Sequence, residues 1–286
     1  MWAENTLKQT KIDVLAAGQL ALLGVCWDQG SSFLRGPAQA PPRIRQALLS
    51  GSSTLASEQG VDLEGEARLV DVGDIWPSPG NSRQEITNAA GAVLRCGASL
   101  LTLGGDHSIS YPLVQAHHQV HTNLTILQFD AHTDLYDELD GDRYSHACPF
   151  ARIMEDGLAS RLVQAGVRAL NKHQREQAER FGVEIIAMRE WRGILPALTG
   201  PVYLSLDLDV LDPAHAPGVS HHEPGGMTSR ELLAALQGIQ VPIVGADIVE
   251  LNPARDLNDM TAMVAAKFLK EIVGMMLSIP AAARDQ

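Results

Sequence analysis

Basic residues are scarce in this sequence of 286 residues. Lys and Arg number 22 against 34 Asp and Glu, which gives a formal net charge of −12. Nucleic acids and anionic membranes are bound by basic surfaces, and the few Lys and Arg here are scattered along the chain. The composition therefore argues against nucleic-acid and membrane partners and favours a small cationic substrate.

Cysteine pairs, linkers and long apolar runs are also absent. The three cysteines form no C-x-x-C pair and cannot all be bridged, which fits a reducing compartment. The most apolar stretch, residues 14–27, is short, is interrupted by Gln19 and follows Glu4 and Asp13, so it predicts neither a signal peptide nor a membrane helix. No Pro/Gly/Ser-rich linker, internal repeat or low-complexity tract divides the chain. We therefore expect one domain over residues 1–286 and a cytoplasmic protein.

Short apolar segments alternate with longer helical patterns in a chain that is 45% apolar. Several of the short segments are apolar at nearly every position, as expected when both faces of a parallel sheet are buried. The alternation predicts an α/β fold with a mainly parallel sheet covered by helices. We predict strands at residues 20–26, 69–72, 99–103, 124–129, 162–167, 183–187, 202–206 and 241–246. We predict helices at residues 42–49, 83–95, 111–119, 172–181, 229–237 and 260–276.

Acidic residues and histidine follow two of the predicted strands, at the edge of the sheet where such folds bind ligands. Asp130, His132 and Asp134 leave the fourth strand at alternate positions, and alternate residues of extended backbone point the same way. Asp207 and Asp209 leave the seventh strand in the same manner. Either cluster alone is weak evidence, because Asp at a strand end is often a turn or cap residue. Burying both clusters without a cation would cost several kcal/mol for each carboxylate.

The segment Gly104-Gly105-Asp106-His107-Ser108 follows the third strand. Its paired glycines allow a tight strand-to-helix turn that brings His107 to the edge of the sheet. A histidine in this position is, by itself, more often an ordinary polar residue than a ligand. The candidates from three strand ends nevertheless exceed what one tetrahedral zinc needs, and their oxygen-rich mixture suits two Mn²⁺ ions. These candidate ligands are His107, Asp130, His132, Asp134, Asp207 and Asp209.

The three motifs, G-G-D-H-S, D-A-H-T-D and S-L-D-L-D-V-L-D-P, resemble the metal motifs of the ureohydrolase family of arginases and agmatinases, in the family's order. The resemblance covers nearly the whole chain, from G-V-C-W-D and Arg35-Gly36-Pro37 to Asn252-Pro253. It implies a three-layer α/β/α fold with a central parallel sheet of eight strands, and assembly into a homotrimer or homohexamer. It also implies a pair of Mn²⁺ ions, with Co²⁺ or Ni²⁺ as alternatives, that hydrolyse a guanidino group to urea and an amine.

The resemblance assigns roles to individual residues. Glu250 matches the carboxylate that holds the guanidinium, and His146 matches the histidine that shuttles a proton to the departing amine. Asp134 would accept a hydrogen bond from the attacking hydroxide. Without the family, Glu250 reads as a solvated acid and His146 as an ordinary loop histidine. The ligands of one ion would be His107, Asp130, Asp134 and Asp209, and those of the other would be Asp130, His132, Asp207 and Asp209.

The sequence favours agmatine as the substrate, with putrescine and urea as products. Tyr136 stands where animal-type arginases have an Asn that holds the α-carboxylate of arginine. The loop at residues 135–145 carries four acids against the single Arg143, which should repel a carboxylate. Arginine remains the alternative, because Arg143 could reach a carboxylate and the segments R-Y-S-H and P-G-V-S-H resemble plant-type arginases. Another guanidino compound is also possible.

Two other classes of protein share parts of this pattern. Metal-dependent deacetylases have the same fold and a D-x-H motif, but they use one zinc and lack both His107 and the second acid of each cluster. A non-catalytic metal-binding oligomer is the other alternative. His221, His222 and Glu223 resemble the family's substrate-facing rim, and the sequence assigns them no role. We expect His117 and its neighbours at the surface around a helix end.

Overall fold

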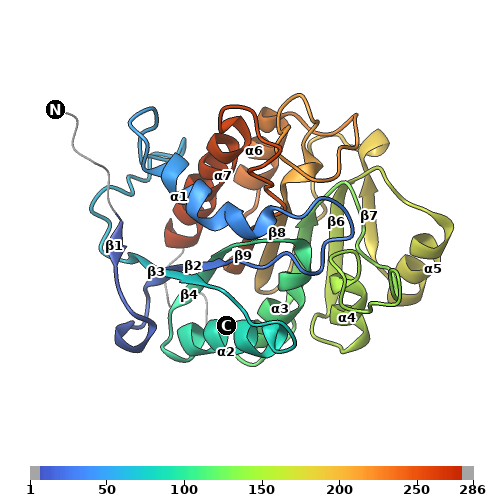
Figure 1. Ribbon diagram of the computed structural model, residues 1–286, viewed down its shortest axis with the longest axis horizontal. Helices are drawn as coiled ribbons and strands as arrows, with labels where there is room; N and C mark the ends of the chain where they lie inside the picture. Colours follow the sequence, from blue (N-terminus) through green and yellow to red (C-terminus); the bar gives the residue numbers. More distant parts are fainter. Residues whose placement is uncertain (1–6, 279–286) are drawn as a thin grey trace.

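The computed structural model describes residues 7–278, which form a central sheet between two layers of helices (Figure 1). Within these residues the sheet has nine strands in the order β1-β3-β2-β4-β9-β8-β5-β6-β7. Every pair of neighbouring strands is parallel. The strands are β1 (Lys8–Gln9), β2 (Leu20–Val25), β3 (Leu69–Ile75), β4 (Ser99–Leu103), β5 (Thr125–Phe129), β6 (Arg161–Val167), β7 (Glu184–Ala187), β8 (Val202–Asp207) and β9 (Ile243–Val249).

The α-helices cover the two faces of this sheet. Helices α1, α6 and α7 lie over one face, and α2, α3 and α4 lie over the other (Figure 1). The helices are α1 (Ala40–Leu48), α2 (Ser82–Arg95), α3 (Ser110–His118), α4 (Pro149–Glu155), α5 (Lys172–Phe181), α6 (Ser229–Gln237) and α7 (Met260–Ser278). Five single turns of 3₁₀-helix are also described: Ile12–Val14, Pro37–Gln39, His107–Ile109, Met188–Glu190 and Leu208–Val210.

The predicted α/β architecture is confirmed, with two differences in detail. The sheet has nine strands rather than eight, because β1 is a two-residue strand that pairs with the edge of the sheet at β3. A segment of two exposed residues gives no periodic signal in the sequence. Helix α4 has only seven residues, begins with a proline, and was not predicted.

The two apolar layers explain why the strands are apolar at almost every position. Leu20 and Leu22 of β2 pack in the layer beneath α1 and α7, whereas Ala21 and Leu23 pack in the layer beneath α2 and α3. Successive side chains of a strand point to opposite faces, so a strand between two helical layers has no solvent face. Polar side chains can therefore gather only at the ends of such strands or where hydrogen bonds satisfy them.

Gly105 shows why the turn after β4 needs glycine. A Cβ atom on Gly105 would lie 1.7 Å from the carbonyl oxygen of Trp27. The same carbonyl accepts a hydrogen bond from the backbone N–H of Asp106 at 2.9 Å, and the carbonyl of Gly105 accepts one from Glu250 at 2.9 Å. The turn therefore packs closely between the backbone of Trp27 and that of Glu250. It places His107 at the carboxyl edge of the sheet, as predicted.

Strand β9 runs to Val249, three residues beyond the predicted end at residue 246. The prediction ended the strand before Asp247, whose carboxylate is fully buried. Three hydroxyl groups satisfy this carboxylate, which removes most of the cost of burying it. They belong to Ser110 at 2.8 Å, Tyr203 at 2.7 Å and Ser205 at 2.7 Å.

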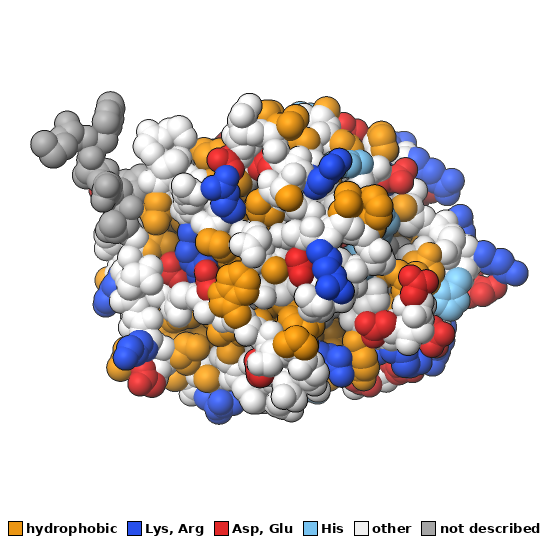
Figure 2. Space-filling view, viewed as in Figure 1, with side chains coloured by type: hydrophobic (Ala, Val, Ile, Leu, Met, Phe, Trp, Pro, Cys, Tyr) orange, Lys and Arg blue, Asp and Glu red, His pale blue; other side chains and the backbone are white. Residues whose placement is uncertain are grey.

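The surface carries charges of both signs. On the face drawn in Figure 2, Lys and Arg are interspersed with Asp and Glu and form no continuous basic stripe. Among the helices of residues 7–278, none combines the length and the apolar character needed to cross a bilayer.

Candidate metal centre and active site

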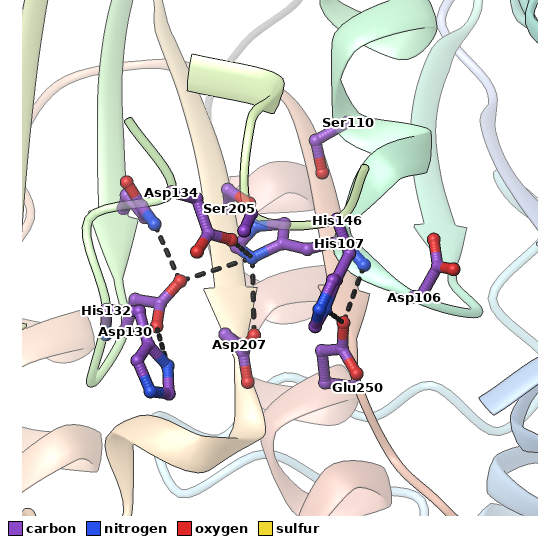
Figure 3. A network of polar contacts seen from close by, with 12 residues as sticks. Asp106, His107, Ser110, Asp130, His132, Asp134, His146, Ser205, Asp207 and Glu250 are labelled. Atoms are coloured by element: carbon purple, nitrogen blue, oxygen red, sulfur yellow. Dashed lines mark hydrogen bonds and ion pairs between the residues drawn. The ribbon is translucent and has the colours of Figure 1, made fainter. Parts of the chain in front are cut away.

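The candidate residues come together at the middle of the sheet. Strands β4, β9, β8 and β5 are neighbours there, and their carboxyl ends supply the candidate ligands and Glu250 (Figure 3). The loop before α4 adds His146. The structure thus unites all of the predicted site residues: His107, Asp130, His132, Asp134, His146, Asp207, Asp209 and Glu250.

The same local turn shapes all three motifs. In each, the first Asp accepts a hydrogen bond from the backbone N–H two residues later, which bends the chain as it leaves the strand. The turn interpretation of these acids is therefore correct, and in Asp130 and Asp207 the other carboxylate oxygen faces His107. The pairs are Asp106 with Ser108 at 3.1 Å, Asp130 with His132 at 2.6 Å and Asp207 with Asp209 at 2.8 Å.

Nδ1 of the buried His107 faces three carboxylates. Their nearest oxygens lie at 3.1 Å (Asp130), 3.0 Å (Asp134) and 3.2 Å (Asp207). Despite these distances, Nδ1 makes no hydrogen bond of acceptable geometry, whereas Nε2 lies 2.9 Å from Ser205 Oγ. A buried imidazole nitrogen and several carboxylate oxygens that point into one space form the donor set that a divalent cation binds.

A second group lies beside the first. Nδ1 of His132 is 2.9 Å from Asp209 Oδ2 and 3.5 Å from Asp130 Oδ1. Asp130 belongs to both groups, because its other oxygen faces His107. Within residues 7–278, the sets that could hold a metal ion are His107–Asp130–Asp207 and Asp130–His132–Asp209. This grouping places Asp207 with His107, whereas the resemblance places it with His132.

The charges of the cluster are not balanced without cations. Burial and the nearby carboxylate of Asp130 raise the pKa of Asp134 to about 6. Burial, followed by the charges of Asp209 and Asp130, raises the pKa of Asp207 well above its usual range. Burial alone would lower the pKa of His107, but the three carboxylates around Nδ1 raise it well above its usual value. A divalent ion can neutralise such carboxylates in place of protons, so the residues present fit a metal pair.

His146 and Glu250 lie beside this cluster (Figure 3). Nδ1 of His146 is 2.9 Å from Glu250 Oε1, and Nε2 is 2.9 Å from Ser32 Oγ. Oε1 of Glu250 also accepts a hydrogen bond from the backbone N–H of His107 at 2.9 Å, but Oε2 is buried without any partner. Burial would lower the pKa of His146, but Glu250 raises it to about 9, so this ring is protonated at neutral pH.

Two of these residues have strained backbone. Asp134 has φ of 49° and Glu250 has φ of 66°, in the left-handed region that glycine prefers. Such conformations cost of order 1–3 kcal/mol in side-chain-bearing residues and concentrate at functional sites. The surrounding structure therefore holds both carboxylates in place against a local preference.

Comparison with known proteins agrees with this geometry. A sequence model of the arginase family matches residues 18–274. Arginase 1, mitochondrial, of Arabidopsis thaliana is 46% identical over 276 residues, which cover 90% of this chain and 81% of the plant protein. The chain belongs to the arginase family. Its members are hydrolases of guanidino compounds with a binuclear metal centre, so the single-zinc deacetylase alternative is set aside.

Two further relatives show the breadth of the similarity. The solved structure of arginase from Medicago truncatula superposes with a TM-score of 0.87 at 44% sequence identity, covering 91% of this chain and 88% of that one. The agmatinase of Bacillus anthracis is 34% identical over 265 residues, covering 89% of this chain and 91% of the agmatinase. The similarity to the arginases named here therefore exceeds that to this agmatinase.

A cavity of about 200 Å³ opens at the candidate metal centre of this arginase-family protein. Its lining joins His146, Glu250 and four of the candidate ligands to Tyr136, Gln174 and His221. No Lys or Arg of the described chain lines it. The hydroxyl of Tyr136 accepts a hydrogen bond from Asn171 Nδ2 at 2.5 Å. Tyr136, which occupies the position of the Asn in animal-type arginases, thus lines the cavity, and its hydroxyl is hydrogen-bonded to Asn171.

Ser205 and Asp247, behind His107, were given no role by the sequence. Asp247 can only accept, so Ser205 Oγ donates its proton to Asp247 Oδ1 at 2.7 Å. The hydroxyl oxygen then accepts from Nε2–H of His107 at 2.9 Å. This series of hydrogen bonds keeps a proton on Nε2, so a metal ion would bind His107 through Nδ1. The sequence signal that could have identified this contact was Asp247, an acid inside the otherwise apolar segment of β9.

The acids of the loop at residues 135–145 lie outside the lining of the cavity, and one of them is held in ion pairs. Asp137 pairs with Arg143 at 3.0 Å and with the buried Arg152 of α4 at 2.9 Å. Arg143 also pairs with Glu155 at 2.7 Å. Neither Arg143 nor any of the four acids of the loop lines the cavity. The charge argument for agmatine therefore loses its physical basis, and so does the suggestion that Arg143 holds a carboxylate.

Only one of the three rim residues faces the cavity. His221 lines it, half-buried, whereas His222 is exposed and its Nε2 lies 2.7 Å from the carbonyl of Pro217. Glu223 is exposed, and its carbonyl accepts hydrogen bonds from Arg168 at 2.6 and 2.9 Å. Burial, followed by the charge of the nearby protonated His146, lowers the pKa of His221.

The surface placement expected for His117 is wrong. The ring is fully buried and packs edge-on against Tyr203, with centroids 4.9 Å apart. It also lies against the backbone of Gly245, where a Cβ atom would be 2.1 Å from Nε2 of His117. Gly245 of β9 leaves space for this ring. The sequence of helix α3 alone gives no sign of that space.

Proposed function

We propose that this protein hydrolyses the guanidino group of L-arginine, which yields ornithine and urea. The observation that carries the guanidino class is Oε2 of Glu250, a buried carboxylate oxygen without a partner in a residue that lines the cavity. Leaving such an oxygen unpaired is costly, and a planar cation with several N–H donors satisfies it best. Family membership supports the same class of substrate.

The metal pair would be held by the six candidate ligands at the strand ends. Two divalent ions, by resemblance Mn²⁺ with Co²⁺ or Ni²⁺ as alternatives, would lower the pKa of water so that hydroxide is available at neutral pH. Nδ1 of His107 faces this space without a hydrogen-bond partner, while Nε2 contacts Ser205. The metal ligands in this proposal are His107, Asp130, His132, Asp134, Asp207 and Asp209.

Three side chains would then act on the substrate. Glu250 binds the guanidinium through its unpaired oxygen and holds the central carbon beside the cluster. Asp134, which already stands in a strained conformation among the ligands, accepts a hydrogen bond from the attacking nucleophile. His146 is protonated at neutral pH and donates a proton to the departing amine. After this transfer the neutral amine and urea can leave.

The choice of arginine rests on the relatives. Plant arginases are 43–46% identical to this chain over about nine tenths of its length, whereas the bacterial agmatinases are 34% identical. The charge argument that favoured agmatine no longer stands, because the acids of residues 135–145 lie outside the cavity lining. Agmatine, the substrate favoured by sequence alone, becomes the second candidate. One observation still supports agmatine. No Lys or Arg lines the described cavity, so no basic side chain there could form an ion pair with the carboxylate of arginine.

Urea release tests the proposal directly. The protein is loaded with Mn²⁺, its metal content is measured, and urea is assayed with L-arginine, agmatine, guanidinobutyrate and guanidine. We expect two ions per chain and the highest kcat/KM with L-arginine. A preference for agmatine of about tenfold, or 1.4 kcal/mol, would overturn the choice of arginine. Two bound ions without urea from any compound would instead identify a non-catalytic metal-binding protein.

Assembly, location and domain organisation stay predictions. A homotrimer or homohexamer is expected from the family, and light scattering of the metal-loaded protein measures it. The Arabidopsis thaliana relative is named as mitochondrial, so the cytoplasmic location expected from the sequence needs its own measurement.

A further inference from the structure

His221 is the one histidine of the cavity whose ring has no hydrogen-bond partner among residues 7–278. His132 is engaged by Asp209, and His146 is engaged by both Glu250 and Ser32. The ring of His221 makes only ring contacts, with centroids 5.1 Å from His146 and 5.9 Å from His132. Because His221 lines the cavity, a ligand in the cavity can reach its ring.

The backbone around His221 is fixed to the strand end that carries Glu250. Asn252, two residues after Glu250, donates from Nδ2 to Ser220 Oγ at 2.9 Å and to the carbonyl of Leu34 at 2.9 Å. Ser220 Oγ donates to the same Leu34 carbonyl at 2.8 Å. A backbone hydrogen bond from Asn252 to Gly218, at 2.7 Å, completes the link. The positions of His221 and Glu250 are therefore coupled through one rigid hydrogen-bonded group.

Further contacts support the ring and its loop from outside the cavity. Phe33 packs against His221 with centroids 5.8 Å apart, and residues 219 and 251 form an antiparallel bridge. The glycine at residue 36 is required here, because a Cβ atom would lie 2.1 Å from Asn252 Oδ1. A surface loop held in this way is suited to present one side chain in a fixed position.

We propose that His221 binds the guanidino group of the substrate, with a ring nitrogen accepting a hydrogen bond from a guanidino N–H that Glu250 does not reach. A guanidinium has more N–H donors than one unpaired carboxylate oxygen can satisfy. His146 is not free to accept these protons, because Nδ1 already contacts Glu250 and Nε2 already contacts Ser32. His221 therefore complements Glu250 as a specificity-determining residue. This inference rests on the proposed function, since it needs a guanidino substrate.

The test compares His221→Phe, which keeps an aromatic ring but removes both nitrogens, with the wild-type protein. We expect kcat/KM to fall roughly ten- to hundredfold, as when a hydrogen bond to a charged group is lost, with unchanged metal content. His221→Gln, which restores an acceptor, should recover part of this loss. His222→Phe is the matched control, because it makes the same change at the exposed neighbouring histidine.

A probe without a side chain identifies the group that His221 contacts. Guanidinium chloride is used as a competitive inhibitor of whichever compound releases urea, and its inhibition constant should rise in His221→Phe by a factor similar to the loss in kcat/KM. An unchanged inhibition constant, an equal loss in His222→Phe, or a loss accompanied by missing metal would each overturn the inference. Absence of urea release by the wild-type protein is a different outcome, because it defeats the proposed function itself.

Discussion

The apolar layers and the carboxyl edge of the sheet are both buried. Only in the apolar layers do the side chains find all of their partners within the protein. Side chains such as Phe268 of α7 are fully enclosed by other apolar groups. At the edge, His107 Nδ1 and Glu250 Oε2 are buried without hydrogen-bond partners. The apolar layers stabilise the fold, whereas the carboxyl edge of the sheet is suited to bind cations and a substrate. A substitution in the apolar layers should therefore lower the free energy of unfolding, whereas one at the carboxyl edge should lower metal content or activity. Four predictions test this difference.

The largest effect is expected from Asp209→Ala. Activity should fall by at least about a thousandfold, because the metal pair that would supply the nucleophile is lost. In the metal-free protein, the free energy of unfolding should fall by only about 1–3 kcal/mol, because the contacts of Asp209 with His132 and Ala131 are lost while its repulsion with Asp207 is relieved. Metal analysis, urea assay and denaturant unfolding measure the three quantities. Full metal content with full activity would contradict the proposed centre.

Phe268→Ala should show the opposite pattern. The lost contacts and the resulting cavity should lower the free energy of unfolding by about 3–5 kcal/mol, because Phe268 is fully buried in the layer beneath α7. The folded fraction should retain its metal and its kcat within about twofold. Denaturant unfolding gives the first quantity, and kinetics normalised to folded protein give the second. A large loss of kcat in fully folded protein would show that the two regions are not separable.

His146→Asn should lower kcat about a hundredfold while leaving metal content unchanged, since the proposed role is proton transfer rather than ligation. The pH dependence of stability provides a second readout. The pKa of His146 is raised from 6.5 to about 9 by Glu250, so its contribution to stability is full below about 6.5 and is lost as the pH rises through about 9. The stability difference between wild type and variant should shrink over that range. A difference independent of pH would contradict the His146–Glu250 pair.

Asp247→Asn should have the smallest effect of the four. An amide can donate to Ser205 and release the hydroxyl from its fixed orientation, so metal affinity should weaken by about 10- to 100-fold. Calorimetric titration with Mn²⁺ measures this affinity. Tyr203→Phe is the control, because it removes a donor to Asp247 without touching the link to His107. Unchanged affinity would show that Asp247 serves only the packing of β9.

The sequence by itself determined the architecture and the candidate ligands. Continuous apolar runs indicated strands buried on both faces, and alternate acids after two of them indicated convergence at one edge. These inferences succeed because side-chain direction in a strand and Asx-type turns are set by residues one or two positions apart. Such local rules placed His107, Asp130 and Asp207 at the same edge of the sheet before any strand order was known.

Only the tertiary structure decided which groups from distant segments meet. The strand order β4-β9-β8-β5 brings Asp247 behind Ser205, and this contact fixes the tautomer of His107. Arg152, from a short helix that was not predicted, pairs with Asp137, an acid that the sequence counted against a carboxylate but that lies outside the cavity lining. Interactions between groups far apart in sequence have no local pattern, because the energy that selects them comes from packing whole layers together. The sequence therefore determined what chemistry is available, and the tertiary structure decided which side chains face the cavity and which are already satisfied.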